Sequence, residues 1–117
     1  MARRRIDPGV GRAAACAAAA DGTDLATASR YLLQVLEDAA PGNTLEVRVP
    51  PFGAAQVVEG PRHTRGTPPN VVEMDAVTWV ALATGSLRWD DAVADARVAA
   101  SGQRADLREW LPVPWET

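Results

Sequence analysis

The hydrophobic positions along the first forty residues of this chain follow the period of an α-helix. Asp7 and Pro8 are typical of an N-cap and a first helical residue, and the alanine-rich run that follows predicts a helix to about residue 20. Residues 24–40 predict a second, amphipathic helix, because one face is apolar and the opposite face is charged or polar. The apolar face consists of Leu25, Ala28, Leu32, Val35, Leu36 and Ala39.

The period then changes to two, which is typical of strands. In residues 44–49 three apolar side chains alternate with two charged ones, so this segment predicts a strand with one face in water. Pro50 and Pro51 end this strand, because neither has an N–H to donate to a neighbour. Gly53 permits a turn and residues 54–59 return as a second strand, so we expect a hairpin.

Residues 71–85 are the stretch around which the rest of the chain is organised. Residues 71–74 predict a short apolar strand, Asp75 is suited to cap a helix, and Gly85 supplies a left-handed stop. The helix between these two signals, residues 76–84, is apolar on nearly every side. Such a helix must be covered by protein or by a ligand, and we expect it to be the most buried element.

The remaining segments are shorter. Residues 60–70 have no periodicity and are rich in glycine and proline, which is typical of a long loop. Residues 90–96 predict a helix with two aspartates in its positive first turn. Residues 97–101 alternate like a strand, and residues 104–111 predict a last short helix with Trp110 in its apolar stripe.

The composition bounds the fold and excludes several kinds of site. A chain of 117 residues has the usual length of one domain. It has one cysteine, Cys16, and one histidine, His63, so neither an internal disulfide nor a thiolate or imidazole metal site is expected. We therefore expect no metal and no cofactor.

The net charge of −3 is distributed unevenly. Residues 1–12 carry a charge of +3 and the remaining residues carry −6, and an acidic body argues against nucleic-acid binding, which needs a basic face. The alanine run at 13–20 lacks Leu, Ile and Phe, so it is a poor secretory segment. No apolar run approaches the roughly 18 residues that span a membrane. We expect a cytoplasmic protein without stable membrane insertion.

No catalytic constellation can be built from the sequence. Asp90, Asp91 and Asp95 are best explained as helix caps and a solvated face. The single cysteine and the single histidine have no recognisable catalytic context, and there is no glycine-rich phosphate loop. We therefore do not expect an enzyme.

Several segments resemble a known family. WVALATG at 79–85, DAV at 91–93 and RVAASG at 97–102 resemble the C-terminal half of the sterol-carrier-protein type 2 fold. More closely, residues 47–73 (VRVPPFGAAQVVEGPRHTRGTPPNVVE) resemble the small actinobacterial sterol carrier family proteins. The similarity covers about residues 24–111.

This resemblance implies a single α+β domain. Its sheet would be largely antiparallel, with about four to five strands, and covered on one face by helices, with an apolar tunnel between them. In better-known members the tunnel takes sterols, fatty acids or acyl chains. The implied domain spans residues 24–117, and residues 1–23 form a basic, alanine-rich segment whose helix packs on it. A fifth strand would have to come from residues 62–67.

The large apolar side chains of the C-terminal half are the candidates for lining such a tunnel. They either line a ligand cavity or fill a core that is otherwise short of aromatic residues. Arg62, His63 and Arg65 are candidates for contacts with a carboxylate or phosphate head group. Alternatively, they belong to a solvated loop whose arginines pair with Glu59 or Glu73. The apolar candidates are Val77, Trp79, Val80, Leu82, Leu87, Trp89, Val93, Leu107 and Trp110.

Two functions from different classes remain open. The first is a non-catalytic carrier of a lipid or another apolar small molecule, in an internal pocket bordered by Val77, Val80, Trp89 and Trp110. The second is a protein-interaction or accessory domain with a closed core and an unspecified protein partner. A detached sterol-carrier-like domain of the mycothiol-dependent isomerases is disfavoured, because their metal-binding four-helix domain is absent. Cavity volume separates the first two, since a drug-sized pocket has about 300 Å³ or more.

Overall fold

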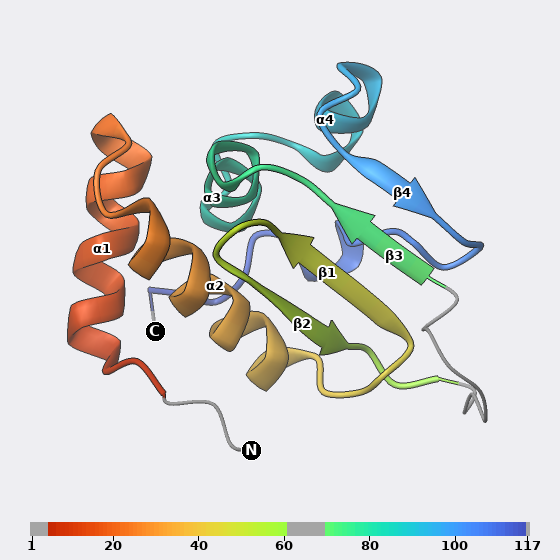
Figure 1. Cartoon of the computed structure of the whole chain (residues 1–117), viewed down its shortest axis with the longest axis horizontal. Coiled ribbons are helices and arrows are strands. Elements are labelled where there is room, and N and C mark those ends of the chain that lie inside the picture. The colour runs from red at the N-terminus through yellow and green to blue at the C-terminus, as the bar shows by residue number, and fades with distance from the viewer. Residues whose placement is uncertain (1–4, 61–69, 117) are drawn as a thin grey trace.

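The computed structural model describes residues 5–60 and 70–116, and within them the chain forms a four-stranded sheet with helices packed against it (Figure 1). The α+β class and the largely antiparallel sheet that the sequence predicts are confirmed. The elements are α1 (Pro8–Asp21), α2 (Leu25–Ala39), β1 (Leu45–Val49), β2 (Gly53–Val57), β3 (Asn70–Glu73), α3 (Ala76–Thr84), α4 (Trp89–Ala94), β4 (Ala99–Ser101) and the 3-10 helix η1 (Arg108–Trp110).

The sheet has the strand order β2-β1-β3-β4. β1 pairs antiparallel with β2, as expected for the hairpin, and parallel with β3, while β3 pairs antiparallel with β4. Val47 of β1 lies between Ala55 and Val72, and all three are buried, whereas Glu46 and Arg48 form an ion pair on the opposite face. One face of the sheet therefore belongs to the core. Residues 62–67, the candidates for a fifth strand, lie outside the described residues.

The helices α1 and α2 form a closely packed pair. Asp7 caps α1 as predicted, because its side chain accepts a hydrogen bond from the backbone N–H of Val10 at 3.1 Å. Gly11 faces the ring of Tyr31 so closely that no Cβ atom would fit between the two helices. None of the described helices combines the length and the hydrophobicity needed to cross a membrane.

The helix α3 has the bounds that its sequence signals predict. Asp75 accepts a hydrogen bond from the backbone N–H of Thr78 at 2.8 Å, and Gly85 ends the helix with a φ of 95°. Trp79 is fully buried, and its indole N–H donates to the backbone oxygen of Ser29 on α2 at 3.2 Å. The expectation that the helix is covered on every side is wrong at Val77, which is 57% exposed because it lies on the side away from the core.

The C-terminal segment differs most from the sequence-based expectation. Residues 104–111 were expected to form a helix, but only Arg108–Trp110 form a single turn of 3-10 helix. The side chain of Asp106 accepts a hydrogen bond from the N–H of Arg108 at 2.8 Å, which competes with helical pairing, and Pro112 favours an extended residue before it. Leu107 is nevertheless fully buried, so the segment packs against the core without a helix. We call residues 104–115 the C-terminal strap.

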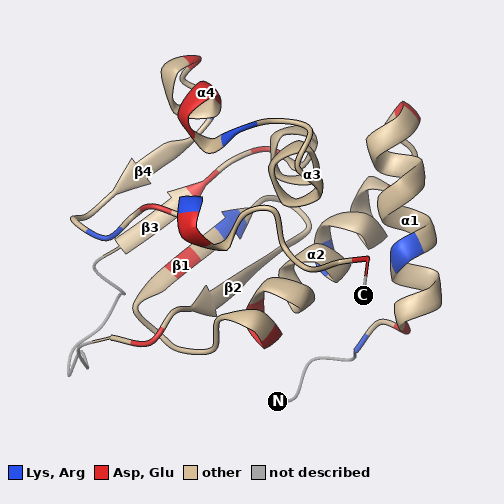
Figure 2. Ribbon diagram, turned by 180° about the vertical axis from the view of Figure 1, so that it is seen from behind, with Lys and Arg blue, Asp and Glu red and all other residues tan. Residues whose placement is uncertain are grey.

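This strap covers the core side of the sheet. It passes behind β1 in Figure 1 and in front of β1 in Figure 2, where the charged residues of η1 are visible beside the strands. The backbone N–H of Val113 donates to the backbone oxygen of Ala83 at 3.0 Å, which fixes the strap to the end of α3. Leu107, Val113 and Trp115 join the hydrophobic core that the sheet shares with the helices.

Candidate functional site

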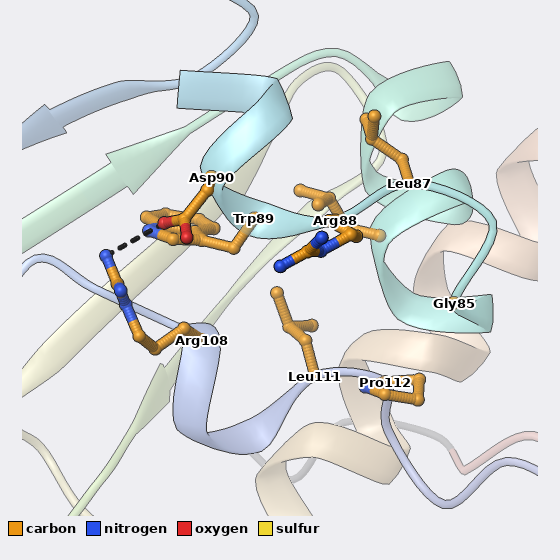
Figure 3. Close-up of a pocket in the computed structure, with 9 residues that line it drawn as sticks. Gly85, Leu87, Arg88, Trp89, Asp90, Arg108, Leu111 and Pro112 are labelled. Atoms are coloured by element: carbon orange, nitrogen blue, oxygen red, sulfur yellow. Dashed lines mark ion pairs between the residues drawn. The ribbon is translucent and has the colours of Figure 1, made fainter. Parts of the chain in front are cut away.

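A pocket of about 310 Å³ lies where the end of α3, the start of α4 and the C-terminal strap meet (Figure 3). Its volume is at the lower limit for sites that bind small molecules. Its lining residues come from segments that are up to thirty residues apart in the chain. They are Leu82, Gly85, Leu87, Arg88, Trp89, Asp90, Arg108, Leu111 and Pro112.

Two local features of the chain create the space. Gly85 ends α3, and the N–H of Leu87 donates back to the oxygen of Ala81 at 3.1 Å, so the chain turns sharply before α4 begins. On the other side, the strap runs past Gly85 with Pro112, whose ring carbons would lie 3.4 Å from a Cβ at that position. The turn and the strap thus form two walls that converge at Gly85.

The pocket is lined by both apolar and charged side chains. Leu82 and Trp89 are buried beneath the pocket, with 0% and 6% of their surface exposed, and Leu87 and Leu111 are half-buried. Figure 3 shows the side chain of Leu111 directed toward Arg88, whereas that of Leu87 points away from Leu111. Burial of apolar ligand surface against such walls contributes about 25 cal/mol per Å². The pocket can therefore hold an apolar group, and it is open to solvent, since five of its lining residues are exposed: Gly85, Arg88, Asp90, Arg108 and Pro112.

Three charged side chains line the pocket. The guanidinium of Arg108 forms an ion pair with Asp90 at 3.0 Å and a second one with Asp106 at 3.0 Å, so both of these carboxylates are already engaged. Arg88, the residue before α4, projects into the space between Trp89 and Leu111 (Figure 3). Its backbone oxygen accepts a hydrogen bond from the N–H of Ala92 at 3.0 Å, but its side chain has no ion-pair or hydrogen-bond partner among the described residues. Its positive charge is therefore available to a ligand.

The structure brings together three of the nine apolar candidates. Leu82, Leu87 and Trp89 line the pocket. Trp79, Val80 and Leu107 instead lie in the core.

The other three apolar candidates lie on the surface. Val77 and Val93 are 57% and 47% exposed, so neither faces inwards. Trp110 is half-buried and lines a second hollow of about 360 Å³ with Val58 and Arg104. The four residues Val77, Val80, Trp89 and Trp110 therefore do not border one pocket. Val77 faces solvent, Val80 lies in the core, and Trp110 lies on a 3-10 turn that lines a different hollow.

The candidates for head-group contacts, Arg62, His63 and Arg65, lie outside the described residues. The sequence interpretation missed Arg88 and the strap residues Leu111 and Pro112. One signal was available for Arg88, since it lies between the predicted turn at Gly85 and a tryptophan. No group of His, Cys, Asp and Glu side chains within residues 5–60 and 70–116 is arranged to hold a metal ion.

The chain is a small α+β domain with a mixed sheet, helices on its core side and a hollow beside α3. The family described as "Bacterial SCP ortholog" matches residues 21–113, and the chain belongs to this family. A comparison with curated proteins gave no significant match.

Proposed function

We propose that this protein is a non-catalytic carrier that binds a lipid or another small apolar molecule in the pocket between α3, α4 and the C-terminal strap. The observation that carries the proposal is an open space of about 310 Å³ bordered by the half-buried residues Leu87 and Leu111, with Leu82 and Trp89 buried beneath it. Membership in a sterol-carrier-like family supports the same class of ligand. The binding site in this proposal is a surface pocket, in place of the internal tunnel expected from the sequence.

The lining of the pocket supports a carrier more than a catalyst. The described side chains around it include no hydroxyl, thiol or imidazole group that could act as a nucleophile. Its one carboxylate, on Asp90, is held by Arg108. What the described pocket offers is shape, apolar surface and one unpartnered positive charge.

A protein-interaction role is the second candidate, and a different observation favours it. Val77 on α3 and Val93 on α4 expose large apolar side chains to solvent. Isolated surface valines are common, so this observation carries less weight than a formed pocket. In the interaction role, filling the pocket would have no effect on partner binding.

The carrier proposal is tested by filling the pocket. We expect native mass spectrometry of the purified protein to show a co-purified amphiphile, and a medium-chain ligand to raise the melting temperature. At a ligand concentration 100-fold above Kd, the stabilisation is about 2.7 kcal/mol. Leu111→Trp places an indole in the pocket and should abolish the shift.

The matched control is Val77→Trp, which adds the same side chain to an exposed position on α3 outside the pocket. It should leave the ligand-dependent shift unchanged. If no amphiphile shifts the melting temperature of the wild-type protein, or if Leu111→Trp binds as well as wild type, the carrier proposal fails at this pocket.

A further inference from the structure

We infer, on the basis of the carrier function proposed above, that the pocket selects a short amphiphile with a carboxylate head group, and that Arg88 is the residue that binds this head group. The inference rests on the size of the pocket and on the charges that line it. Neither property follows from the fold class, since both depend on particular side chains at the α3–α4 turn and on the strap.

The volume limits the length of the apolar part. A space of about 310 Å³ holds about ten water-sized groups, at about 30 Å³ for each. Octanoate, with about ten non-hydrogen atoms, fills such a space, whereas a sterol has nearly three times as many. The end of a longer acyl chain would extend beyond the open pocket into water.

The charges favour one negative charge on the ligand. Asp90 would repel an anion, and its ion pair with Arg108 at 3.0 Å offsets only part of that repulsion, because Arg108 also pairs with Asp106. The positive charge that attracts an anion is therefore that of Arg88. Arg88 is left with its charge directed into the pocket and without a partner among the described residues. A guanidinium beside an apolar wall binds a carboxylate through charge-assisted hydrogen bonds while the chain contacts the wall.

A carboxylate fits these charges better than a phosphate monoester. A phosphate monoester carries a charge of about −1.5 to −2 at neutral pH, and a single guanidinium cannot balance it. The excess negative charge would lie beside Asp90 and would weaken the ion pair with Arg108. The pocket should therefore prefer a monoanion to a dianion of the same chain length.

The experiment is isothermal titration calorimetry at pH 7 and low ionic strength with octanoate, octanol, octyl phosphate and dodecanoate. The wild-type protein should bind octanoate about five- to tenfold more tightly than octanol, which is the factor expected for a charge-assisted bond at a partly solvated site. Each methylene group that enters the pocket should tighten binding about fourfold. Dodecanoate should gain less than about tenfold over octanoate, because its additional methylene groups lie outside.

Arg88→Gln is the decisive variant, and Arg12→Gln on α1, away from the pocket, is the control with the same change in net charge. In Arg88→Gln the preference for octanoate over octanol should disappear while octanol binds as before. The control should keep the full preference. Both positions are on the surface, so both variants are expected to fold, and circular dichroism checks this.

The outcomes separate this inference from the carrier proposal. If octanoate and octanol bind wild type equally, or if Arg88→Gln keeps the preference, the assignment to Arg88 is overturned and the carrier proposal stands. Tighter binding of octyl phosphate would overturn the carboxylate preference, and a gain of 100-fold or more for dodecanoate would overturn the size limit. If none of the four compounds binds, the carrier proposal itself fails at this pocket.

Discussion

The contact between α1 and α2 depends on a glycine that faces an aromatic ring, and Gly11→Ala should therefore destabilise the protein. A Cβ atom at Gly11 would lie 2.2 Å from both Cγ and Cδ1 of Tyr31 and 2.6 Å from Cδ2. Tyr31 is 4% exposed, and the clash is at the root of its ring. The ring cannot move aside by a change at the tip of the side chain, so the helices must separate or the core must repack.

Two effects of opposite sign determine the magnitude. Alanine is favoured over glycine in a helix interior by about 0.8–1 kcal/mol. Overpacking a filled core costs about 1–3 kcal/mol, and the upper end applies here, since the contact must open by more than about 1 Å to become ordinary. We expect a net loss of about 2 kcal/mol in the free energy of unfolding. For a domain of this size, that corresponds to a decrease of about 6–10 °C in melting temperature.

Urea denaturation followed by tryptophan fluorescence measures this loss, and the same helix offers a matched control. Gly9 is exposed, and a Cβ there would lie 3.1 Å from Oδ2 of Asp7, the atom that caps the helix, and would meet no part of α2, so Gly9→Ala should change stability far less than Gly11→Ala. In a Tyr31→Ala background, Gly11→Ala should cost little, because the ring that it meets is gone. Equal stability of Gly11→Ala and Gly9→Ala would refute the close packing of α1 on α2.

Two further predictions concern the ends of helices. The hydrogen bond from the backbone N–H of Thr78 holds the pKa of Asp75 below its ordinary value of 3.8. Asp75→Ala should cost about 0.5–2 kcal/mol of stability near neutral pH. Because the pKa is lowered on folding, this difference should be constant above about pH 4 and shrink as the pH falls through the folded-state pKa, which urea titrations at several pH values would show. The side chain of Gln34 accepts a hydrogen bond from the N–H of Ile6 at 2.9 Å and donates one to the oxygen of Ile6 at 3.1 Å. Gln34→Ala should therefore speed tryptic cleavage after Arg5, as measured by mass spectrometry. An unchanged rate would show that these hydrogen bonds do not protect the segment.

The elements of this fold that could be predicted are those whose signals are local. The helix at 76–84 has its cap and its stop in adjacent residues, and its bounds agree with the structure. The hairpin of β1 and β2 follows from a change of period and from a turn of three residues. Neither needs a partner elsewhere in the chain to form its backbone pattern.

Pairings between distant segments could not be predicted in the same way. The parallel contact between β1 and β3 joins residues 45–48 to residues 70–73, and no apolar alternation in β3, whose sequence is NVVE, encodes this register. The helix expected at residues 104–111 is absent because the fate of this segment also depends on distant contacts. Its apolar residues Leu107, Trp110 and Leu111 have helical spacing, but only Leu107 is fully buried, while Trp110 and Leu111 line two different hollows, so the same spacing arises without a helix.

The charged residues of the candidate site could not be predicted from the sequence either, because their partners come from distant segments. From the sequence, residues 62–65 are the natural candidates for a head-group contact, because basic side chains are close together there. The availability of a charge depends instead on which partners the fold supplies. Arg88 is followed two residues later by Asp90, which in the sequence is an obvious partner, yet the strap brings Arg108 to that aspartate from eighteen residues away. The side chain of Arg88 has no partner among the described residues, and this property, on which the proposed selectivity depends, is set by the fold.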